Sequence, residues 1–311
     1  MKKQMASQHD PRLFTDHESL VALHHRGDLL HLPSFLQLHS ILSGQRQSPL
    51  RGRGLNFEEM RHYQQGDDVR HIDWRVTART GKPHVRVYNE EKDHHVTLCI
   101  DQRNSMFFAS VDTMKSVVAA EISAIIGGSI LRTSDRVGIS IFSDQGIIAN
   151  KPTRTRSNYL YQLRQLVEVN QSLHINNPSL PENQLTAILN RLLQNRDKNT
   201  LIIIVSDFHQ CDQECIKKLQ YLQRHNHVLC ISITDPLEQS FDASDWIITD
   251  GELQINMDSR TSQEAMRQHL HETYHRRRAS LSRLMQLNHL PLLELDTSGQ
   301  HIEQLLRGLG G

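Results

Sequence analysis

The chain has 311 residues, which corresponds to about two domains of ordinary size. Its 35 basic and 35 acidic side chains balance, whereas general nucleic-acid-binding proteins usually carry a basic excess, so we expect no nucleic-acid partner. Four cysteines without paired spacing fit a reducing compartment, and no apolar run reaches the length of about 18 residues that a membrane span needs.

The N-terminal part of the chain is expected to be a separate segment. Residues 16–42 read as short helical pieces that Gly27 and Pro33 interrupt. Residues 44–53 are rich in Gly, Arg, Gln and Ser, which is typical of an exposed connection. We therefore assign residues 1–53 to an N-terminal helical segment and linker.

A β-rich element is expected next, over residues 54–94. Apolar and polar residues alternate over residues 76–78 and 85–88, on both sides of the turn-forming sequence Gly-Lys-Pro at 81–83. This alternation predicts a β-hairpin. Arginines and acidic residues are interspersed along the same element.

Strands and helices alternate from residue 95 onward. Short, continuous apolar runs are typical of strands buried on both faces of a parallel sheet, and longer segments with helical spacing separate them. The expected strands cover residues 95–100, 137–142, 147–148, 201–205, 228–233 and 290–295. The expected helices cover residues 112–131, 159–169, 185–193, 216–224, 262–287 and 302–309. The pattern predicts a doubly wound, mostly parallel α/β sheet over residues 95–311.

Two acidic residues follow expected strands, Asp101 after the first strand and Asp207 after the most apolar one. Ligands of open α/β sheets bind beyond the carboxyl ends of the strands, where the strand order reverses. Two carboxylates at adjacent strand ends can hold Mg²⁺ or Mn²⁺, or each can instead accept hydrogen bonds from the backbone of the following loop or helix. The spacing alone leaves both alternatives open.

A resemblance to a known family covers most of the chain. Residues 52–74, GRGLNFEEMRHYQQGDDVRHIDW, and residues 77–80, TART, resemble the signature of the domain of unknown function 58 family. The signature positions that we single out are Glu58, Arg61, Tyr63, Gly66, Asp67, Asp68, Arg70, Asp73, Trp74 and Arg79. Residues 101–108 and 114–121 are similar to the family's first strand and helix.

The resemblance runs from about residue 36 to the C-terminus and carries expectations about fold and partners. It implies a von Willebrand factor A-like domain in the second part of the chain. It also implies a MoxR-type AAA+ ATPase as a partner, because such ATPases are commonly encoded with family members. Many members carry transmembrane helices before the signature, and this sequence has none there, so the resemblance indicates a soluble, cytoplasmic version.

The von Willebrand A fold often carries a metal-ion-dependent adhesion site, with the motif Asp-x-Ser-x-Ser, a later Thr and a distant Asp. The residues that match by position are Asp101, Ser105, Asp207 and, for the threonine, Thr153 or Thr155. Arg103 replaces the first Ser of the motif, and a guanidinium offers only donors and a permanent charge. Pointing inward, Arg103 would take the cation's place and pair with Asp101 or Asp207. Pointing outward, it would leave an incomplete oxygen shell that Mg²⁺ could complete with water. We favour the closed, metal-free site, with no cofactor.

The carboxylates of the signature allow a catalytic and a structural interpretation. Acid–base catalysis is possible in principle, but no nucleophile with a base and no phosphate-binding loop lies nearby. We expect instead that Gly66 begins a turn that Asp67 or Asp68 ends. We further expect Arg70 and Asp73 to pair and hold Trp74 over the core.

Two other groups of residues are weaker candidates. His209, Cys211 and Cys215 lack the paired spacing of a zinc site, and Cys215 is expected to pack in a helix that Asp212 caps. Several arginines lie on the expected helix over residues 262–287: Arg267, Arg276, Arg277, Arg278 and Arg283. Only Tyr274 offers a nearby aromatic platform for nucleic acid, so a solvated helix face is favoured. A docking surface for an acidic partner is the next alternative.

These observations predict a non-enzymatic interaction protein. By resemblance, it serves as an adaptor or substrate partner of a MoxR-type AAA+ ATPase in protein assembly or remodelling. Its expected partner-binding residues are Asp101, Arg103, Ser105, Thr153, Thr155 and Asp207. The alternative from another class is a metal-dependent hydrolase, in which Asp101 and Asp207 hold Mg²⁺ or Mn²⁺ that polarises a phosphoryl group.

Overall fold

The computed structural model divides the chain into two compact units. Met1–Gln45 and His94–Gly311 form one, which we call the α/β unit, and Arg46–Asp93 form the other, which we call the signature unit. Of the N-terminal segment, the described residues 10–30 belong to the α/β unit. The described residues are 10–30, 56–64, 67–89, 94–174, 183–209, 211–239, 247–249, 254–256 and 260–310.

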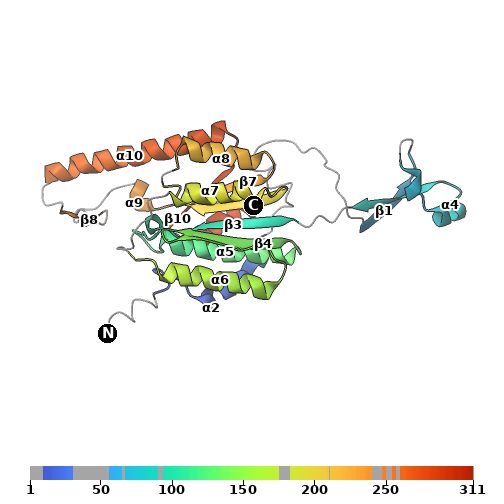
Figure 1. Cartoon of the computed structure of the whole chain (residues 1–311), viewed down its shortest axis with the longest axis horizontal. Coiled ribbons are helices and arrows are strands. Elements are labelled where there is room, and N and C mark those ends of the chain that lie inside the picture. The colour runs from blue at the N-terminus through green and yellow to red at the C-terminus, as the bar shows by residue number, and fades with distance from the viewer. Residues whose placement is uncertain are drawn as a thin grey trace. The chain divides into compact units, whose positions relative to one another are not determined.

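A six-stranded sheet forms the centre of the α/β unit (Figure 1). Its strands are β3 (His95–Asp101), β4 (Arg136–Ser143), β5 (Gly146–Ala149), β6 (Thr200–Ser206), β7 (His227–Thr234) and β10 (Leu292–Asp296). They lie in the order β10-β7-β6-β3-β4-β5, and all neighbours are parallel except β5, which is antiparallel to β4. The predicted, mostly parallel α/β sheet is confirmed. The strand order reverses at β3, because β4 and β6 lie on its two sides.

Helices cover both faces of this sheet (Figure 1). One face carries α2 (His17–His25), α5 (Lys115–Arg132), α6 (Arg156–Gln171) and α11 (His301–Gly310). The other face carries α7 (Gln184–Asn195), α8 (Gln213–Gln223) and α10 (Arg260–Leu287). Shorter elements of this unit are η1 (Arg26–Leu29), η3 (Asn104–Met106), α9 (Pro236–Gln239), β8 (Ile247–Thr249) and β9 (Gln254–Asn256). Among the described helices, none combines the length and the apolar composition that crossing a bilayer requires.

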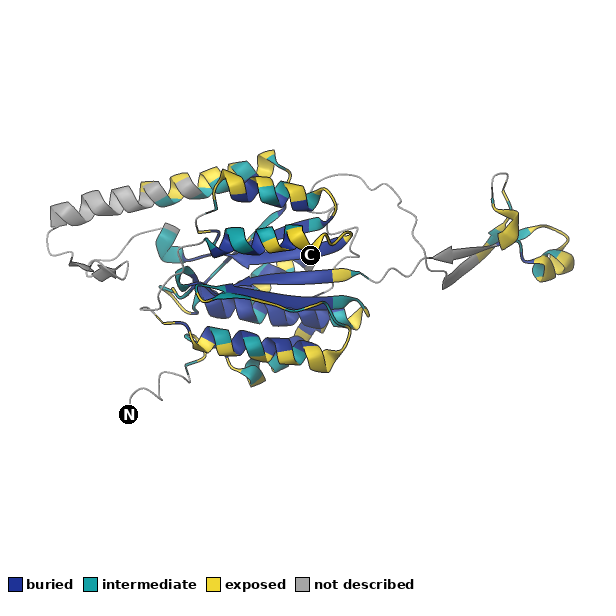
Figure 2. Ribbon diagram, viewed as in Figure 1, coloured by how far each residue is buried: buried dark blue, intermediate teal, exposed yellow. Residues whose placement is uncertain are grey.

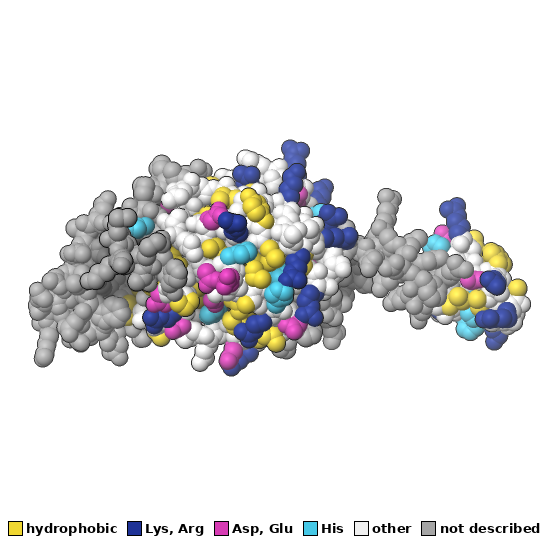
Figure 3. All heavy atoms as spheres, turned by 90° about the horizontal axis from the view of Figure 1, so that it is seen from below, with side chains coloured by type: hydrophobic (Ala, Val, Ile, Leu, Met, Phe, Trp, Pro, Cys, Tyr) yellow, Lys and Arg dark blue, Asp and Glu magenta, His cyan; other side chains and the backbone are white. Residues whose placement is uncertain are grey.

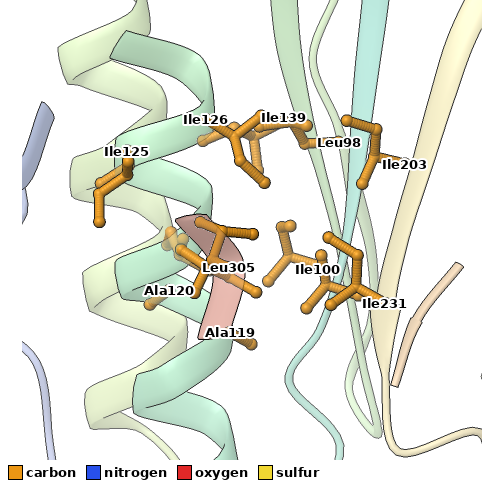
Figure 4. Close-up of a cluster of buried hydrophobic side chains, with 14 of the residues drawn as sticks. Leu98, Ile100, Ala119, Ala120, Ile125, Ile126, Ile139, Ile203, Ile231 and Leu305 are labelled. Carbon is orange, nitrogen blue, oxygen red and sulfur yellow. The ribbon is translucent and has the colours of Figure 1, made fainter. Parts of the chain in front are cut away.

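The period-two alternation of strand side chains fills two cores. Leu98 and Ile100 of β3 pack toward α5, where the small side chains of Ala119 and Ala120 let the helix lie close to the sheet (Figure 4). Cys99, between them, belongs to the core on the opposite face. The strands are accordingly dark blue throughout most of Figure 2, as expected for a sheet buried on both sides.

Two consecutive glycines let neighbouring helices approach α5 closely. A Cβ atom on Gly127 would lie 2.0 Å from the Tyr159 hydroxyl oxygen of α6, and one on Gly128 would lie 2.1 Å from the His24 carbonyl oxygen of α2. Real Cβ atoms need more room than this, so these positions require glycine. The close approach of α2 to α5 at Gly128 anchors α2 on the α/β unit.

The signature unit contains an antiparallel strand pair, but one of its two strands differs from the prediction. Its elements are β1 (Asn56–His62), η2 (Val69–His71), α4 (Trp74–Thr80) and β2 (His84–Asn89). β2 pairs antiparallel with β1, and residues 76–78 belong to α4, so their predicted strand is wrong. Asp73 accepts hydrogen bonds from the backbone N–H groups of Arg75 and Val76, and Gly81 ends the helix at a φ of 73°. These two caps outweigh the β-propensity of the residues between them.

Candidate functional site

The carboxyl ends of β3 and β6 meet where the strand order of the sheet reverses. Ile100 pairs with Val205, so Asp101 at the end of β3 lies beside the point where the chain leaves β6 at Asp207. The backbone N–H of Arg103 donates to Asp101 Oδ1 at 3.0 Å, which turns the chain back over the strand ends. The structure thus places the two predicted aspartates and Arg103 together.

Arg103 points inward, which is one of the two orientations that the sequence left open. Its Nε lies 3.0 and 3.1 Å from the two carboxylate oxygens of Asp101, and its Nη2 lies 2.7 Å from Asp101 Oδ2. The same Nη2 donates to Asp207 Oδ1 at 3.4 Å, and Nη1 donates to the His209 carbonyl at 3.3 Å. The guanidinium lies 5.8 Å from the Phe142 ring centroid. The side chains of Arg103, Asp101 and Asp207 are only 5, 0 and 7% exposed.

Further hydrogen bonds fix the two carboxylates. Ser206 Oγ donates to Asp101 Oδ2 at 2.6 Å and accepts the backbone N–H of Phe208 at 2.9 Å. Asp207 Oδ1 accepts the backbone N–H of His209 at 2.8 Å. Buried charges are tolerated when they are paired and hydrogen-bonded in this way. The arrangement is therefore a closed network and not an open crevice.

Burial and the neighbouring charges shift the pKa values of Asp101, Arg103 and Asp207. Burial alone would lower the pKa of Arg103, but the carboxylates of Asp101 and Asp207 outweigh it and hold that pKa above its usual value. Burial raises the pKa of Asp101 against the pull of the guanidinium. For Asp207, burial acts upward, but the positive charges of Lys115 and Arg103 outweigh it and hold the pKa below its usual range. Arg103 therefore remains a permanent cation in the folded protein.

The resemblance to the von Willebrand A fold implies a divalent cation here, held by Asp101, Ser105 and Asp207. The Ser105 hydroxyl is buried and has no hydrogen-bond partner among the described residues. Both carboxylates, however, already contact the guanidinium of Arg103, and a cation at the same oxygens would lie beside a permanent positive charge. In this arrangement the residues do not fit a divalent cation.

Thr153 and Thr155 do not lie at this edge of the sheet. Thr153 exchanges two backbone hydrogen bonds with Val137, of 2.9 and 3.0 Å, near the amino end of β4, whereas Asp101 pairs with Phe142 near its carboxyl end. Because β5 runs antiparallel to β4, the chain has returned to the amino end before α6 begins. The prediction that both threonines lie at the carboxyl edge of the sheet is therefore wrong.

A third strand-end carboxylate was not identified from the sequence. Asp235 follows β7 and is fully buried. It accepts hydrogen bonds from the backbone N–H groups of Ser110 and Leu237, at 2.8 and 2.9 Å, and from the hydroxyls of Ser110 and Thr297. These bonds hold the loop after β3 across the carboxyl edge. The signal was available, because an acidic residue follows an apolar strand as it does at Asp101.

The same loop leads to a buried lysine that sequence patterns did not reveal. Lys115, at the start of α5, lies 2.6 Å from Glu238 Oε1 and is 3% exposed in its side chain. The ring of Phe108 lies 5.6 Å from the Lys115 ammonium. Beside Lys115 and Asp207 is a cavity of about 60 Å³, which has room for only a few water molecules.

The ion pairing within the signature unit differs from the prediction. Arg61 forms a two-pronged ion pair with Asp67, with N···O distances of 2.7 and 2.9 Å. The Tyr63 backbone N–H donates to the Pro83 carbonyl at 2.9 Å. Gly66 and the side chain of Glu58 lie outside the described residues.

The predicted pairing of Arg70 with Asp73 over a buried Trp74 is wrong. Asp73 caps α4, and Asp68 accepts the Arg70 backbone N–H at 2.9 Å. Trp74 is 68% exposed, and Arg79 is also exposed. The carboxylate of Asp73, which was expected to bind Arg70, instead caps the short helix α4.

Cys215, the cysteine at the start of α8, is packed in the protein core. Cys215 is buried in the first turn of α8, and its backbone N–H donates to Asp212 Oδ1 at 2.8 Å, which confirms the predicted cap. The Thr186 hydroxyl lies 3.2 Å from Cys215 Sγ. Within the described part of the chain, no group of three His, Cys, Asp or Glu side chains is arranged to hold a metal ion.

The arginines of α10 have different surroundings. Arg278 pairs with Glu294 of β10 through two bonds of 3.1 and 2.5 Å, whereas Arg276 and Arg283 are exposed. The side chains of Arg267 and Arg277 lie outside the described residues. Figure 3 shows that on one face of the molecule both signs of charge are interspersed with histidines, in line with the balanced composition.

Comparisons with known proteins identify the family. The family described as "Protein of unknown function DUF58" matches residues 59–280. The uncharacterized proteins Rv1480 of Mycobacterium tuberculosis and Mb1516 of Mycobacterium bovis are each 26% identical to the chain over 273 residues, which cover 87% of this chain and 84% of theirs.

Solved structures give weaker similarities. The conserved hypothetical protein BatB from Bacteroides thetaiotaomicron superposes with a TM-score of 0.40 at 12% identity, over 69% of this chain and 99% of that one. An aerotolerance-related membrane protein from Bacteroides fragilis gives a TM-score of 0.38 at 13% identity, with the same coverage. The family match, by contrast, extends over most of the residues of both units, and the chain belongs to the DUF58 family.

Proposed function

We propose that the chain is a non-enzymatic adaptor whose α/β unit is von Willebrand A-like and works with a MoxR-type AAA+ ATPase in protein assembly or remodelling. The mostly parallel sheet, with one antiparallel edge strand and helices on both faces, supports this architecture. The choice of ATPase rests on the resemblance of the signature and of the first strand and helix to the family.

The observation that carries the proposal is the contact of the Arg103 guanidinium with both Asp101 and Asp207. A metal-dependent hydrolase would need these carboxylate oxygens to bind its cation. Here they are neutralised by a side chain of the same loop. The cavity beside Asp207 has a volume of about 60 Å³, whereas small-molecule sites usually reach about 300 Å³ or more. A structural role, in which the network holds the surrounding loops in place, therefore explains these residues better than catalysis does.

The recognition surface lies on the loop that these buried groups support. The loop runs from Asp101 to α5 and exposes two large apolar side chains, Phe108 at 37% and Val111 at 61%. Between them, Ser110 is tied to Asp235 at the end of β7. Exposed apolar side chains on a fixed loop are typical of protein-binding sites. Asp101, Arg103 and Asp207 act beneath this surface as its support.

The test is a binding measurement between the purified chain and a MoxR-type AAA+ ATPase, by surface plasmon resonance in ATP and in ADP. Val111→Asp and Phe108→Ala are expected to weaken binding at least tenfold, because central apolar contacts dominate interface energies. Ile148→Ala is the matched control, since Ile148 is 38% exposed but lies on the edge strand β5. Absence of binding in both nucleotides, or equal weakening by the control, would contradict the proposal.

A thermal-unfolding series tests the metal-free state of the site separately. We expect millimolar Mg²⁺ or Mn²⁺ to leave the unfolding temperature of the wild type unchanged and to raise that of Arg103→Ser, in which the carboxylates and Ser105 are released. Saturation at 100 times the dissociation constant stabilises by about 2.7 kcal/mol. A rise in the wild type that Asp101→Ala abolishes would instead favour the metal-dependent hydrolase.

A further inference from the structure

Helix α4 of the signature unit exposes an aromatic and basic face, which is mostly yellow in Figure 2. Trp74, Arg75, Ala78 and Arg79 are all exposed, and their spacing places them on one side of the helix. Trp74 is 68% exposed, although tryptophan is highly buried on average in folded proteins. A large, solvent-exposed aromatic ring beside two arginines is typical of a binding surface.

Three acidic side chains of this unit are described, and each accepts hydrogen bonds from other groups. Asp67 pairs with Arg61, Asp68 accepts a backbone N–H of η2, and Asp73 accepts two backbone N–H groups of α4. These hydrogen bonds come from the backbone and from the side chain of Arg61. None of these hydrogen bonds goes to a side chain on the exposed face of α4.

Four described cations of the unit are consequently available to a partner. In the part of the signature unit whose side chains are described, Arg70, Arg75, Arg79 and Lys82 are exposed and form no ion pair. Figure 3 shows the described part of this unit with hydrophobic and basic side chains next to one another. The surface complements an occupant that carries several negative charges and at least one apolar group.

We propose that this face of α4 is a docking surface for an acidic, extended segment of a partner protein. Arg75 and Arg79 are four residues apart, which separates their Cβ atoms by about 5–6 Å on a helix. Alternate residues of an extended chain lie about 6–7 Å apart on one side, so a Glu-x-Glu sequence matches the two guanidinium groups. Each can bind a carboxylate through two parallel hydrogen bonds, and an apolar residue of the segment packs on Trp74.

A protein segment fits this face better than nucleic acid does. Single-stranded nucleic acid is usually bound by several aromatic side chains on which successive bases stack, whereas Trp74 is the single aromatic residue of α4. The chain as a whole also has no net positive charge. Tryptophan and arginine are, in addition, the residue types that most often dominate protein–protein binding energy.

The experiment follows the fluorescence of Trp74 in the full chain. The sequence contains two tryptophans, so Trp246→Phe leaves Trp74 as the reporter. The probe is a synthetic peptide of alternating Glu and Leu, and its control is the same peptide with Gln in place of Glu. We expect a saturable change with the Glu peptide and at least tenfold weaker binding of the Gln peptide. Arg75→Gln/Arg79→Gln is expected to weaken the Glu peptide at least tenfold as well.

A matched variant separates a specific site from general attraction. Arg191→Gln/Arg283→Gln removes the same charge from exposed positions of α7 and α10, and it is expected to bind the Glu peptide as the wild type does. Equal weakening by this variant, or no response of Trp74 to the peptide, would overturn the proposal. So would tighter binding of an oligothymidylate than of the peptide. Protection of Trp74 from acrylamide quenching in the free chain would also overturn it, because the face would then be covered already.

Discussion

The same Asp-x-Arg turn occurs at the carboxyl edge of the sheet and at the start of helix α4, but its arginine is buried at the first place and exposed at the second. At four Asp-x-Arg sequences among the described residues, Oδ1 of the aspartate accepts the backbone N–H of the arginine at 2.9–3.0 Å. The pairs are Asp10 and Arg12, Asp68 and Arg70, Asp73 and Arg75, and Asp101 and Arg103. The backbone geometry is thus alike at all four places.

The arginine side chains behave differently because their surroundings differ. Arg103 is buried, so its guanidinium is satisfied by protein acceptors, chiefly the carboxylates of Asp101 and Asp207. Arg75 is exposed, and water satisfies its donors without a carboxylate. The turn determines the course of the backbone, and burial determines whether the arginine stabilises the fold or remains available to a partner.

The largest expected effect comes from removing the buried guanidinium. Arg103→Met leaves the buried carboxylate of Asp101 without its counter-charge and removes one of the two cations near Asp207. Leaving a buried charge unpaired destabilises proteins by about 3–5 kcal/mol. We expect a loss of this size in the free energy of unfolding, measured with a chemical denaturant at neutral pH.

Arg12→Met is the matched control for that variant. Arg12 makes the same side-chain bonds to Asp10, of 3.1 and 2.8 Å, but its side chain is 61% exposed. We expect its unfolding midpoint to equal that of the wild type, because water replaces the ion pair. Equal losses in the two variants, or none in either, would show that burial does not separate the two turns.

A buried ionisable group without a counter-charge should give up its charge instead. His24 is 6% exposed, and burial, with the nearby positive charges of Arg156 and His25, lowers its pKa from 6.5 to about 4. The unfolded chain therefore binds a proton between pH 6.5 and 4 that the folded chain refuses, so stability falls as the pH falls through this range. By pH 5 we expect a loss of about 1–2 kcal/mol relative to pH 7.

The measurement for His24 is the free energy of unfolding of the wild type and of His24→Gln at several pH values from 7 to 4.5. The variant lacks the titrating group, so its stability should depend less on pH by the same amount. His225→Gln, at an exposed position after α8 on the other face of the sheet, should retain the dependence of the wild type. Identical pH profiles of the wild type and His24→Gln would contradict the prediction.

The fold of the α/β unit could be predicted because its signals are strong and local. The apolar run of β6 and the helical spacing in α5 each allow one interpretation. Helix α4 could not be predicted in this way, because Val76 and Thr77 favour a strand and the helix has only seven residues. Its caps, Asp73 and Gly81, decide the outcome, and both residue types are also common in turns.

The candidate site could be predicted only in part. Asp101 and Asp207 follow strands that the sequence shows clearly, and the sheet brings them together. The direction of β5 is not encoded in its few apolar residues, so Thr153 and Thr155 were assigned to the wrong end of the sheet. The orientation of Arg103 depends on burial by distant segments, which no local pattern contains.

An intermediate effect is expected where the aspartate of the turn caps a helix. Asp73→Ala removes the acceptor of two backbone N–H groups of α4, and loss of such a cap costs about 0.5–2 kcal/mol. We expect faster amide hydrogen exchange at Arg75 and Val76, whereas the amides of β3 in the α/β unit should exchange as in the wild type. Unchanged exchange in α4 would mean that the cap does not stabilise the helix.

The smallest effect is expected for the arginines of the exposed turns. Arg70→Ala and Arg75→Ala keep the backbone N–H groups that bind Asp68 and Asp73, so the turns should persist. Because neither side chain forms an ion pair among the described residues, each variant should change the free energy of unfolding by no more than about 0.5 kcal/mol. Hydrogen exchange in α4 should likewise remain as in the wild type. A loss in Arg75→Ala comparable to that in Arg103→Met would mean that Arg75 stabilises its own unit, and its guanidinium would then not be available to a partner.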